Sequence, residues 1–442
     1  MNKLSSDVFI ENVYRTIYET APDVHLMLLE SQLSGHPSNR YTLFASDPDI
    51  VLSAYGNRVF IAQKGSGKTE EIRECDPWEM IKVTREKFPG WYFGHLGYDL
   101  KNHIENLHSE NPDITGAPDL MLFRPTRMLK YDHHNHEFNL QEGLSFANKA
   151  MNKPASQVKK SDQNFHLENL SWITQKKDYL DRIKWAQQKI RDGDFYEINL
   201  SHVLTGDLKG NPFDLYLKMK AGGAVPFASY TRASSFSICC SSPERFLCRK
   251  GNRIFSQPIK GTAPRLADPE QDHQIQNRLK DSEKEKAENL MIVDLVRHDL
   301  SKVAIPGTIR VPELYKLHSF ETVHQLISTV EGRVENDTDP VDILKACFPM
   351  GSMTGAPKIS AMNAIEKLED YKRGIYSGAA GYITPEGDFD FNVVIRTAIV
   401  NGRKLFYPAG GAITSDSIPE DELEETMVKA RALTSVLKSD SK

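Results

Sequence analysis

The stretch Ala228–Gly261, ASYTRASSFSICCSSPERFLCRKGNRIFSQPIKG, limits the fold more than any other part of this chain. Its short apolar runs predict consecutive strands, with turns at Ser242-Pro243 and Gly251-Asn252. Strands that follow one another through short turns pair antiparallel. Helices and strands do not alternate regularly elsewhere in the chain, so the sequence favours an α+β fold with antiparallel sheets.

Two helical segments flank this stretch. DYLDRIKWAQQKIRDGDF repeats apolar residues at helical spacing and predicts a helix that ends at Gly193, with a strand following in FYEINLSHVL. A single long helix is expected from about Pro269 to Leu300. Earlier in the chain, YTLFASDPDIVLSAYGNRVFIA and WYFGHLGYD predict short strands.

The 442 residues are enough for two ordinary domains or one large one. Composition changes once, in a polar segment without apolar periodicity at residues 151–170, which predicts a linker. The linker would separate an N-terminal region, residues 1–150, from a C-terminal region, residues 171–442.

Charge and cysteine content exclude several classes of protein. A net charge of −5 gives no long-range attraction to nucleic acid or to an anionic membrane. Five cysteines without a CxxC spacing argue against a disulfide framework and against a zinc site. No apolar run reaches the roughly 18 residues that a membrane span needs, and the start of the chain lacks a signal-peptide core. We therefore expect a cytoplasmic protein with no nucleic-acid or membrane partner.

Two acidic pairs recur at a spacing of three residues: Glu285 with Glu288, and Glu422 with Glu425. On a helix, residues three apart share one face, so each pair directs two carboxylates the same way. Two such helices facing each other would supply oxygen ligands for Mg²⁺. The alternative is that both pairs lie on solvated helix faces, where such spacing is common.

Three further features point to bound anions without proving them. Gly410 and Gly411 are expected in a loop whose backbone N–H groups are free to bind a carboxylate or phosphate, or that serves only as a turn. In FPMGSMTGAPK, Gly, Ser and Thr residues precede Pro357 and a predicted helix, which suits either an anion site or a simple helix start. Arg396 stands in an apolar strand, where a charge needs either a ligand carboxylate or an internal acid as its partner.

Lys260 lies between a proline and a Gly-Thr step, and Glu244 precedes it by sixteen positions in SPERFL. A hairpin between them would bring a carboxyl and an amine together. That pair is suited to protonating a leaving group and attacking carbon, although an ordinary cross-strand ion pair gives the same pattern.

Eight segments, in unbroken order from about Asp178 to Lys438, resemble the signature motifs of the chorismate-utilising enzymes. They are SPERF, PIKGTAPR, AENLMIVDLVRHDL, VHQLISTVEG, GSMTGAPK, SGAAGYI, FNVVIRT and DSIPEDELEETMVKAR. VHLMLLESQL and FGHLGYDL extend the resemblance weakly into the N-terminal region.

The resemblance implies a two-layer sandwich of antiparallel sheets, with outer helices, around a central cleft that binds Mg²⁺ and chorismate, and with the two regions interleaved. It implies Glu288 and Glu425 as metal ligands, with Glu285 and Glu422 beside them. The residues implied to contact chorismate are Gly261, Thr262, His324, Thr354, Tyr382, Arg396 and Gly410.

Within the family, the anthranilate synthases usually read PIAGT where this chain reads PIKGT, and a lysine here resembles the branch that aminates chorismate at C4 for folate synthesis. The resemblance implies that Lys260 adds to ring C2, that Glu244 protonates the departing 4-hydroxyl, and that ammonia then attacks C4. Because a lysine must be neutral to attack, we expect burial beside Mg²⁺ to lower its pKa.

This chain departs from the family pattern at three positions: His298, Ala412 and Glu197. A glutamine is common at the position of Glu197, and isochorismate synthases carry there the lysine that activates water. The absence of that lysine from this chain disfavours water as the nucleophile. The sequence assigns no role to Glu197.

The chain has no Gly-x-Cys-x-Gly segment of the kind that glutamine amidotransferases carry, so a separate amidotransferase subunit is expected to supply ammonia. LLES, which ends at Ser31, resembles the tryptophan-binding segment of anthranilate synthases, and Ser31 is a candidate tryptophan contact. Two alternatives remain: an anthranilate synthase component, and a catalytically silent subunit that binds tryptophan.

Overall fold

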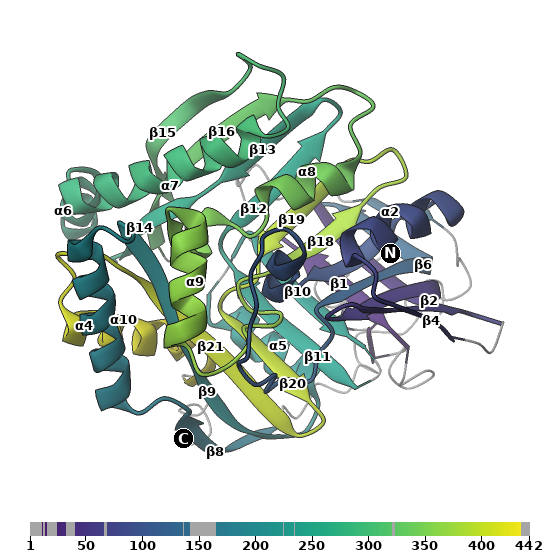
Figure 1. Cartoon of the computed structure of the whole chain (residues 1–442), viewed down its shortest axis with the longest axis horizontal. Coiled ribbons are helices and arrows are strands. Elements are labelled where there is room, and N and C mark those ends of the chain that lie inside the picture. Colours follow the sequence, from purple (N-terminus) through teal and green to yellow (C-terminus); the bar gives the residue numbers. More distant parts are fainter. Residues whose placement is uncertain are drawn as a thin grey trace.

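The computed structural model describes residues 24–31, 40–65, 69–135, 137–141, 165–223, 225–233, 235–320 and 323–434, together with Glu11, Tyr14 and Arg15. Every strand pairing among these residues is antiparallel, and helices cover the outer faces (Figure 1). The predicted α+β fold is confirmed.

The strands fall into two layers that share β2 and β6. One layer runs outward from these two strands through β5, β18, β19, β12, β13 and β16 to β15. In the same layer β14 pairs with β16, and on the other side of β2 the sheet continues through β3 to β4. Its strands are β2 (Tyr41–Tyr55), β3 (Arg58–Gln63), β4 (Thr69–Arg73), β5 (Tyr92–Leu96), β6 (Leu120–Asp132), β12 (Arg245–Lys250), β13 (Arg253–Gln257), β14 (Ile259–Pro264), β15 (Arg310–Ser319), β16 (Val323–Arg333), β18 (Ala379–Ile383) and β19 (Phe389–Val393).

The other layer starts where β1 pairs with the first half of β2 and continues through β10, β11, β20, β21 and β9 to β8. β17 adds to β9, and β7 adds to the end of β6. The strands are β1 (Leu26–Glu30), β7 (Glu137–Gln141), β8 (His166–Trp172), β9 (Glu197–Lys209), β10 (Phe227–Arg232), β11 (Phe236–Ser242), β17 (Gly355–Ala356), β20 (Thr397–Asn401) and β21 (Lys404–Ile413).

A register shift between Pro48 and Ile50, beside Asp47 with its φ of 56°, divides β2 into its two halves. One buried cluster joins side chains of both layers, including Phe93 of β5 and Ile238 of β11. Burial of this shared apolar surface holds the two layers together.

Three groups of helices cover the outer faces. α2 (Pro77–Lys87), α7 (Glu283–Ser301) and α8 (Pro340–Cys347) pack on the first layer, and α5 (Pro212–Ala221) packs on the second. α4 (Lys176–Asp192), α9 (Lys358–Leu368) and α10 (Pro419–Lys429) share an apolar cluster with β9 and β21, and Figure 1 shows them on one side of the molecule. The remaining described helices are α6 (Pro269–Lys280) and the short α11 (Arg431–Thr434), with the 3-10 helices η1 (Tyr98–His103) and η3 (Gly351–Met353).

Several local predictions are confirmed and two are corrected. α4 ends at Gly193, whose φ of 87° suits glycine at a helix C-terminus. The long helix expected from Pro269 to Leu300 is two helices, because Ser282 caps a new one: its hydroxyl accepts a hydrogen bond from the N–H of Glu285. This break places Glu285 in the first turn of α7.

The expected turn at Gly251-Asn252 joins β12 to β13. Ser242-Pro243, in contrast, is not a hairpin. β11 pairs with β10 and β20, whereas β12 pairs with β13 and β19, so the chain passes from one layer to the other at Pro243. A proline cannot donate to a ladder, which is consistent with a break in pairing at this position.

Most of the predicted linker, residues 151–164, lies outside the described residues, and its last part belongs to β8. The regions before and after it share the sheets, since β1 pairs with β10 and β5 pairs with β18. No helix among the described residues is long and apolar enough to cross a membrane.

Candidate active site

Lys260 lies in β14, and acids surround its amine. Nζ is 2.8 Å from Oε1 of Glu197 in β9 and 4.0 Å from Oε2 of Glu288 in α7. Burial by itself lowers the pKa of the amine, but the carboxylates of Glu197, Glu288 and Glu244 outweigh burial and raise the pKa above its usual value. With these carboxylates alone the lysine is a cation in an acidic site. The expected lowering of its pKa supposed Mg²⁺ beside the amine and stays a prediction.

Glu244 lies in the connection between β11 and β12. Its Oε1 accepts a hydrogen bond of 2.8 Å from the hydroxyl of Ser352 in η3. Burial raises the pKa of this carboxyl to about 7, although the Ser352 hydroxyl and the Lys260 amine both oppose the shift. Glu244 is therefore able to carry a proton near neutral pH, and its electrostatic contact with Lys260 places both groups around one space.

The two acidic pairs lie on helices, as predicted: Glu285 and Glu288 on α7, and Glu422 and Glu425 on α10. Burial raises the pKa of Glu288 and of Glu422. Burial acts in the same direction on Glu425, but the ammonium of Lys429, 2.6 Å away, leaves the pKa of that carboxyl below its usual value.

Two lysines show that the helices face a common space. Lys260 interacts electrostatically with both Glu288 and Glu425, and Lys284 does the same. Among the described residues, however, no three acids, histidines or cysteines converge closely enough to form a metal-binding cluster.

The donor set still suits a hard cation, because all four side chains are carboxylates. Two glycines, Gly261 and Gly411, lie beside these carboxylates. A Cβ on Gly261 would stand 3.1 Å from Oε2 of Glu285, and a Cβ on Gly411 would stand 3.4 Å from Oε2 of Glu422. The residues present therefore fit Mg²⁺ by the chemistry of their donor atoms, and Gly261 lets the backbone lie close to Glu285.

The prediction that Gly410 and Gly411 lie in a loop is wrong. Both are inside β21, where they pair with Ser201 and Leu200 of β9. A Cβ on Gly410 would lie 2.7 Å from the carbonyl oxygen of Leu200, so glycine permits the close approach of the two strands. The carbonyl oxygen of Gly410 accepts a hydrogen bond from Nζ of Lys429.

Arg396 was predicted within a strand, and this is wrong: it lies after the end of β19 and has a φ of 51°. Burial lowers the pKa of its guanidinium, while Tyr407 and Glu244 oppose this shift from nearby. The guanidinium makes no hydrogen bond or ion pair with any described residue. The side chain is half-buried and Glu244 is an acid among its electrostatic neighbours, so both explanations stay open; the lack of a direct hydrogen bond favours a bound anion.

Thr354 is buried beside the site. Its hydroxyl bonds to the carbonyl oxygen of Gly351, 3.1 Å away, and its carbonyl oxygen accepts from the N–H of Asn199. Gly261 also borders the site through Glu285, whereas the side chain of Thr262 is exposed.

His324 is fully buried, with Nε2 2.9 Å from Asp272 of α6 and Nδ1 2.8 Å from the hydroxyl of Ser319. Lys260 lies opposite Leu326 in the β14–β16 pair, so His324, two positions from Leu326, is on the same face of the sheet as Lys260. Its contact with chorismate stays a prediction.

Tyr382 packs against Trp91 and Phe93, with ring centroids 5.4 and 5.9 Å apart, in the core between the two layers. The structure does not bring it to the carboxylates. Tyr376, which precedes the same strand, is buried and interacts electrostatically with Tyr407, which in turn interacts with Arg396. Tyr407 is therefore the tyrosine in direct electrostatic contact with Arg396, and Tyr376 lies beside Tyr407.

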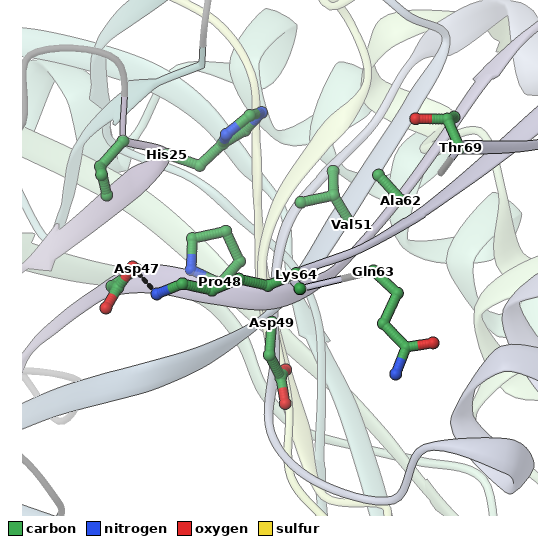
Figure 2. A pocket seen from close by; sticks show the side chains of 11 residues that line it. His25, Asp47, Pro48, Asp49, Val51, Ala62, Gln63, Lys64 and Thr69 are labelled. Carbon is green, nitrogen blue, oxygen red and sulfur yellow. Dashed lines mark hydrogen bonds and ion pairs between the residues drawn. The ribbon is translucent and has the colours of Figure 1, made fainter. Parts of the chain in front are cut away.

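Ser31, the candidate tryptophan contact, is buried after β1, and its hydroxyl makes no hydrogen bond with the described residues. Residues 32–33 of the resembling segment lie outside them. A separate hollow of about 420 Å³ lies over β2 and β3, between His25, Pro48 and Thr69 (Figure 2). Lys64 and Asp47 form a 2.6 Å ion pair in it, and it contains none of the predicted site residues.

Sequence reasoning missed two hydrogen-bond partners of Lys260 and Glu244, namely Glu197 and Ser352. An acid in the otherwise apolar start of β9 was the available signal for Glu197, because such a charge needs a partner. No comparable signal marked Ser352, since its bond to Glu244 depends on how η3 packs.

The geometry agrees with comparisons to known proteins. Residues 26–435 match the chorismate binding enzyme family, and the chain belongs to it. Aminodeoxychorismate synthase component 1 of Salmonella typhimurium is 32% identical over 93% of this chain and 94% of its own length. Anthranilate synthase component 1 of Acetivibrio thermocellus is also 32% identical, over 92% of this chain and 88% of its own.

Among solved structures, anthranilate synthase component I from Streptococcus pneumoniae superposes with a TM-score of 0.77 at 27% identity. The superposition covers 91% of this chain and 93% of that one. The two-layer sandwich with outer helices, expected from the sequence motifs, is thus a fold that this protein shares with a solved relative.

Proposed function

We propose that this chain is the chorismate-aminating component of an aminodeoxychorismate synthase. The observation that carries the proposal is the electrostatic contact between Lys260, a cation with 12% of its side chain exposed, and Glu244, a buried carboxyl able to carry a proton near pH 7. The similarity to bacterial aminodeoxychorismate synthase component 1 over nearly the whole chain supports it.

The reaction that these residues support has two displacements. The neutral Lys260 amine bonds to ring C2 while the C4–O bond breaks, and Glu244 gives its proton to the hydroxyl, which leaves as water. Ammonia then bonds to C4 while the C2–N bond breaks and Lys260 departs as an amine. The excess proton on the new C4 ammonium group returns to Glu244, which restores both residues.

Lys260 is protonated at rest and has to lose that proton before it attacks. The nearest described oxygen is Oε1 of Glu197. Arg396, half-buried and without a side-chain hydrogen bond to any described residue, is a candidate to bind a carboxylate of chorismate. Ser352 fixes the carboxyl of Glu244 by its hydrogen bond.

We further propose Mg²⁺ as the cofactor, held by Glu288 and Glu425 with Glu285 and Glu422 beside them. When bound, the cation would neutralise a substrate carboxylate and withdraw electron density from the ring. The carboxylate donor set and the two glycines beside it support this assignment.

Ammonia is proposed to come from a separate glutamine amidotransferase subunit. The absence of a Gly-x-Cys-x-Gly segment in the sequence and the name component 1 of its relatives support this. Glutamine-dependent activity of the purified chain alone would refute it. Tryptophan is proposed at Ser31, whose buried hydroxyl lacks a partner among described residues; no thermal shift with tryptophan would argue against it.

Anthranilate synthesis is the second candidate, because anthranilate synthase components resemble the chain equally well in identity. The deciding experiment is to incubate the purified chain with chorismate, Mg²⁺ and an ammonium salt and to identify the product by mass and fluorescence. Aminodeoxychorismate, convertible to p-aminobenzoate by added lyase, supports the proposal. Anthranilate supports the second candidate, and no turnover supports a silent subunit.

A further inference from the structure

Glu197 is a departure from the family pattern to which the sequence assigned no role. Its side chain is 1% exposed, Oε1 accepts from Lys260, and Oε2 has no hydrogen-bond partner among the described residues. Burying a carboxylate with one free oxygen is costly. Lys260 is therefore its only hydrogen-bonding partner in the described chain.

The backbone of Glu197 is fixed more firmly than that of Lys260. Glu197 begins β9 and pairs with Ala356 of β17, and the N–H of Tyr196 donates to the carbonyl oxygen of Ala356, 2.6 Å away. β14 is irregular where Lys260 lies: its register against β16 shifts between Lys260 and Thr262, around Gly261 with its φ of 79°.

Lys260 has competing partners on the other side. Nζ is 4.0 Å from Oε2 of Glu288, and it also interacts electrostatically with Glu425. A lysine has a long flexible stem and pairs with the acid that is closest, because charges attract strongly in a poorly solvated site. Without Glu197, the ammonium would move to the carboxylates of α7 and α10.

We propose that Glu197 positions the Lys260 amine, holding Nζ on the β9 side, away from Glu288 and Glu425. This inference rests on the proposed function. The hydrogen bond between Lys260 and Glu197 then has two consequences. The amine stays where it can reach the ring, since displacements of about 1 Å cost large factors in rate. The Lys260 ammonium also stays out of competition with a cation for the carboxylates of the two helices.

The test compares Glu197→Met, which keeps the side-chain length but removes both oxygens, with Glu197→Gln, which keeps one acceptor. One readout is the rate at which intact protein gains the mass of a dehydrated chorismate adduct when ammonia is absent. The other is Mg²⁺ affinity by calorimetry without substrate. We expect Glu197→Met to reduce both by about tenfold, or ~1.4 kcal/mol, and Glu197→Gln to recover at least part of each loss.

Two controls separate positioning from general destabilisation. Glu366→Met disrupts another buried pair, in which Lys101 lies 2.7 Å from Glu366, and it should lower thermal stability without changing adduct formation or Mg²⁺ affinity. In a Lys260→Ala background, Glu197→Met should no longer weaken Mg²⁺ binding, because the competing ammonium is gone.

Wild-type adduct formation and Mg²⁺ affinity in a folded Glu197→Met variant would overturn the inference, and so would Mg²⁺ weakening that persists without Lys260. If Glu197→Met does not fold, unchanged values for both quantities in Glu197→Gln would overturn it as well. Failure of the proposed function is a different result: wild-type protein would then make anthranilate or no product at all.

Discussion

The hydroxyl of Ser352 donates a 2.8 Å hydrogen bond to Oε1 of Glu244, and both side chains are buried. The two residues are far apart in sequence, in η3 and in the connection before β12. The bond favours the charged form of Glu244, whereas burial favours the neutral form, and the pKa of about 7 results from their opposition.

Ser352→Ala should raise the pKa of Glu244 further, by about one unit, because it removes a bond to the carboxylate form. A step that needs protonated Glu244 slows as pH rises through this pKa, so the descending limb of the rate profile should move to higher pH. The measurement is kcat against pH with the concentration of free ammonia held constant. Ser352→Thr, which retains the hydroxyl, is the control, and an unmoved limb in Ser352→Ala would contradict the assignment.

Glu244→Gln should make the protein more stable than wild type above neutral pH. The folded-state pKa of Glu244, about 7, exceeds its unfolded value, so its contribution to stability is present at low pH and is lost as pH rises through 7. The loss amounts to about 3 kcal/mol from one carboxyl. Urea unfolding of both proteins at about pH 5 and about pH 8 measures it. A difference that does not grow with pH would show that Glu244 is charged in the folded state.

Glu425→Gln should weaken Mg²⁺ binding by about tenfold, because an amide is a poorer ligand for a hard cation than a carboxylate. Glu424→Gln is the matched control, since Glu424 stands next to it on α10 with 63% of its side chain exposed. Metal titration followed by calorimetry compares the three proteins. Equal affinities would mean that α10 does not hold the cation.

Arg396→Lys should raise KM for chorismate by about tenfold, because lysine keeps the charge but loses the two-pronged contact with a carboxylate. kcat should change much less. Arg253→Lys serves as a control, since that guanidinium pairs with Glu331 at the surface. Steady-state kinetics distinguish the outcomes, and an unchanged KM would require another partner for the half-buried guanidinium of Arg396.

The sequence by itself determined the fold class, the family and the residue types of the site. Successive short strands between turn residues demand antiparallel pairing, and carboxylates three residues apart must share a helix face, so these predictions depend only on local spacing. The helices of Glu288 and Glu425 and the end of α4 at Gly193 followed from such spacing.

Only the tertiary structure decided which side chains meet. A resemblance between motifs does not show what each side chain contacts: His324 bonds to Asp272 and Ser319, and Tyr382 packs on Trp91. The partnership of Lys260 with Glu197 joins strands from different layers, and the pKa of a buried group depends on every charge around it. Long-range packing sets both, and no local pattern in the sequence contains it.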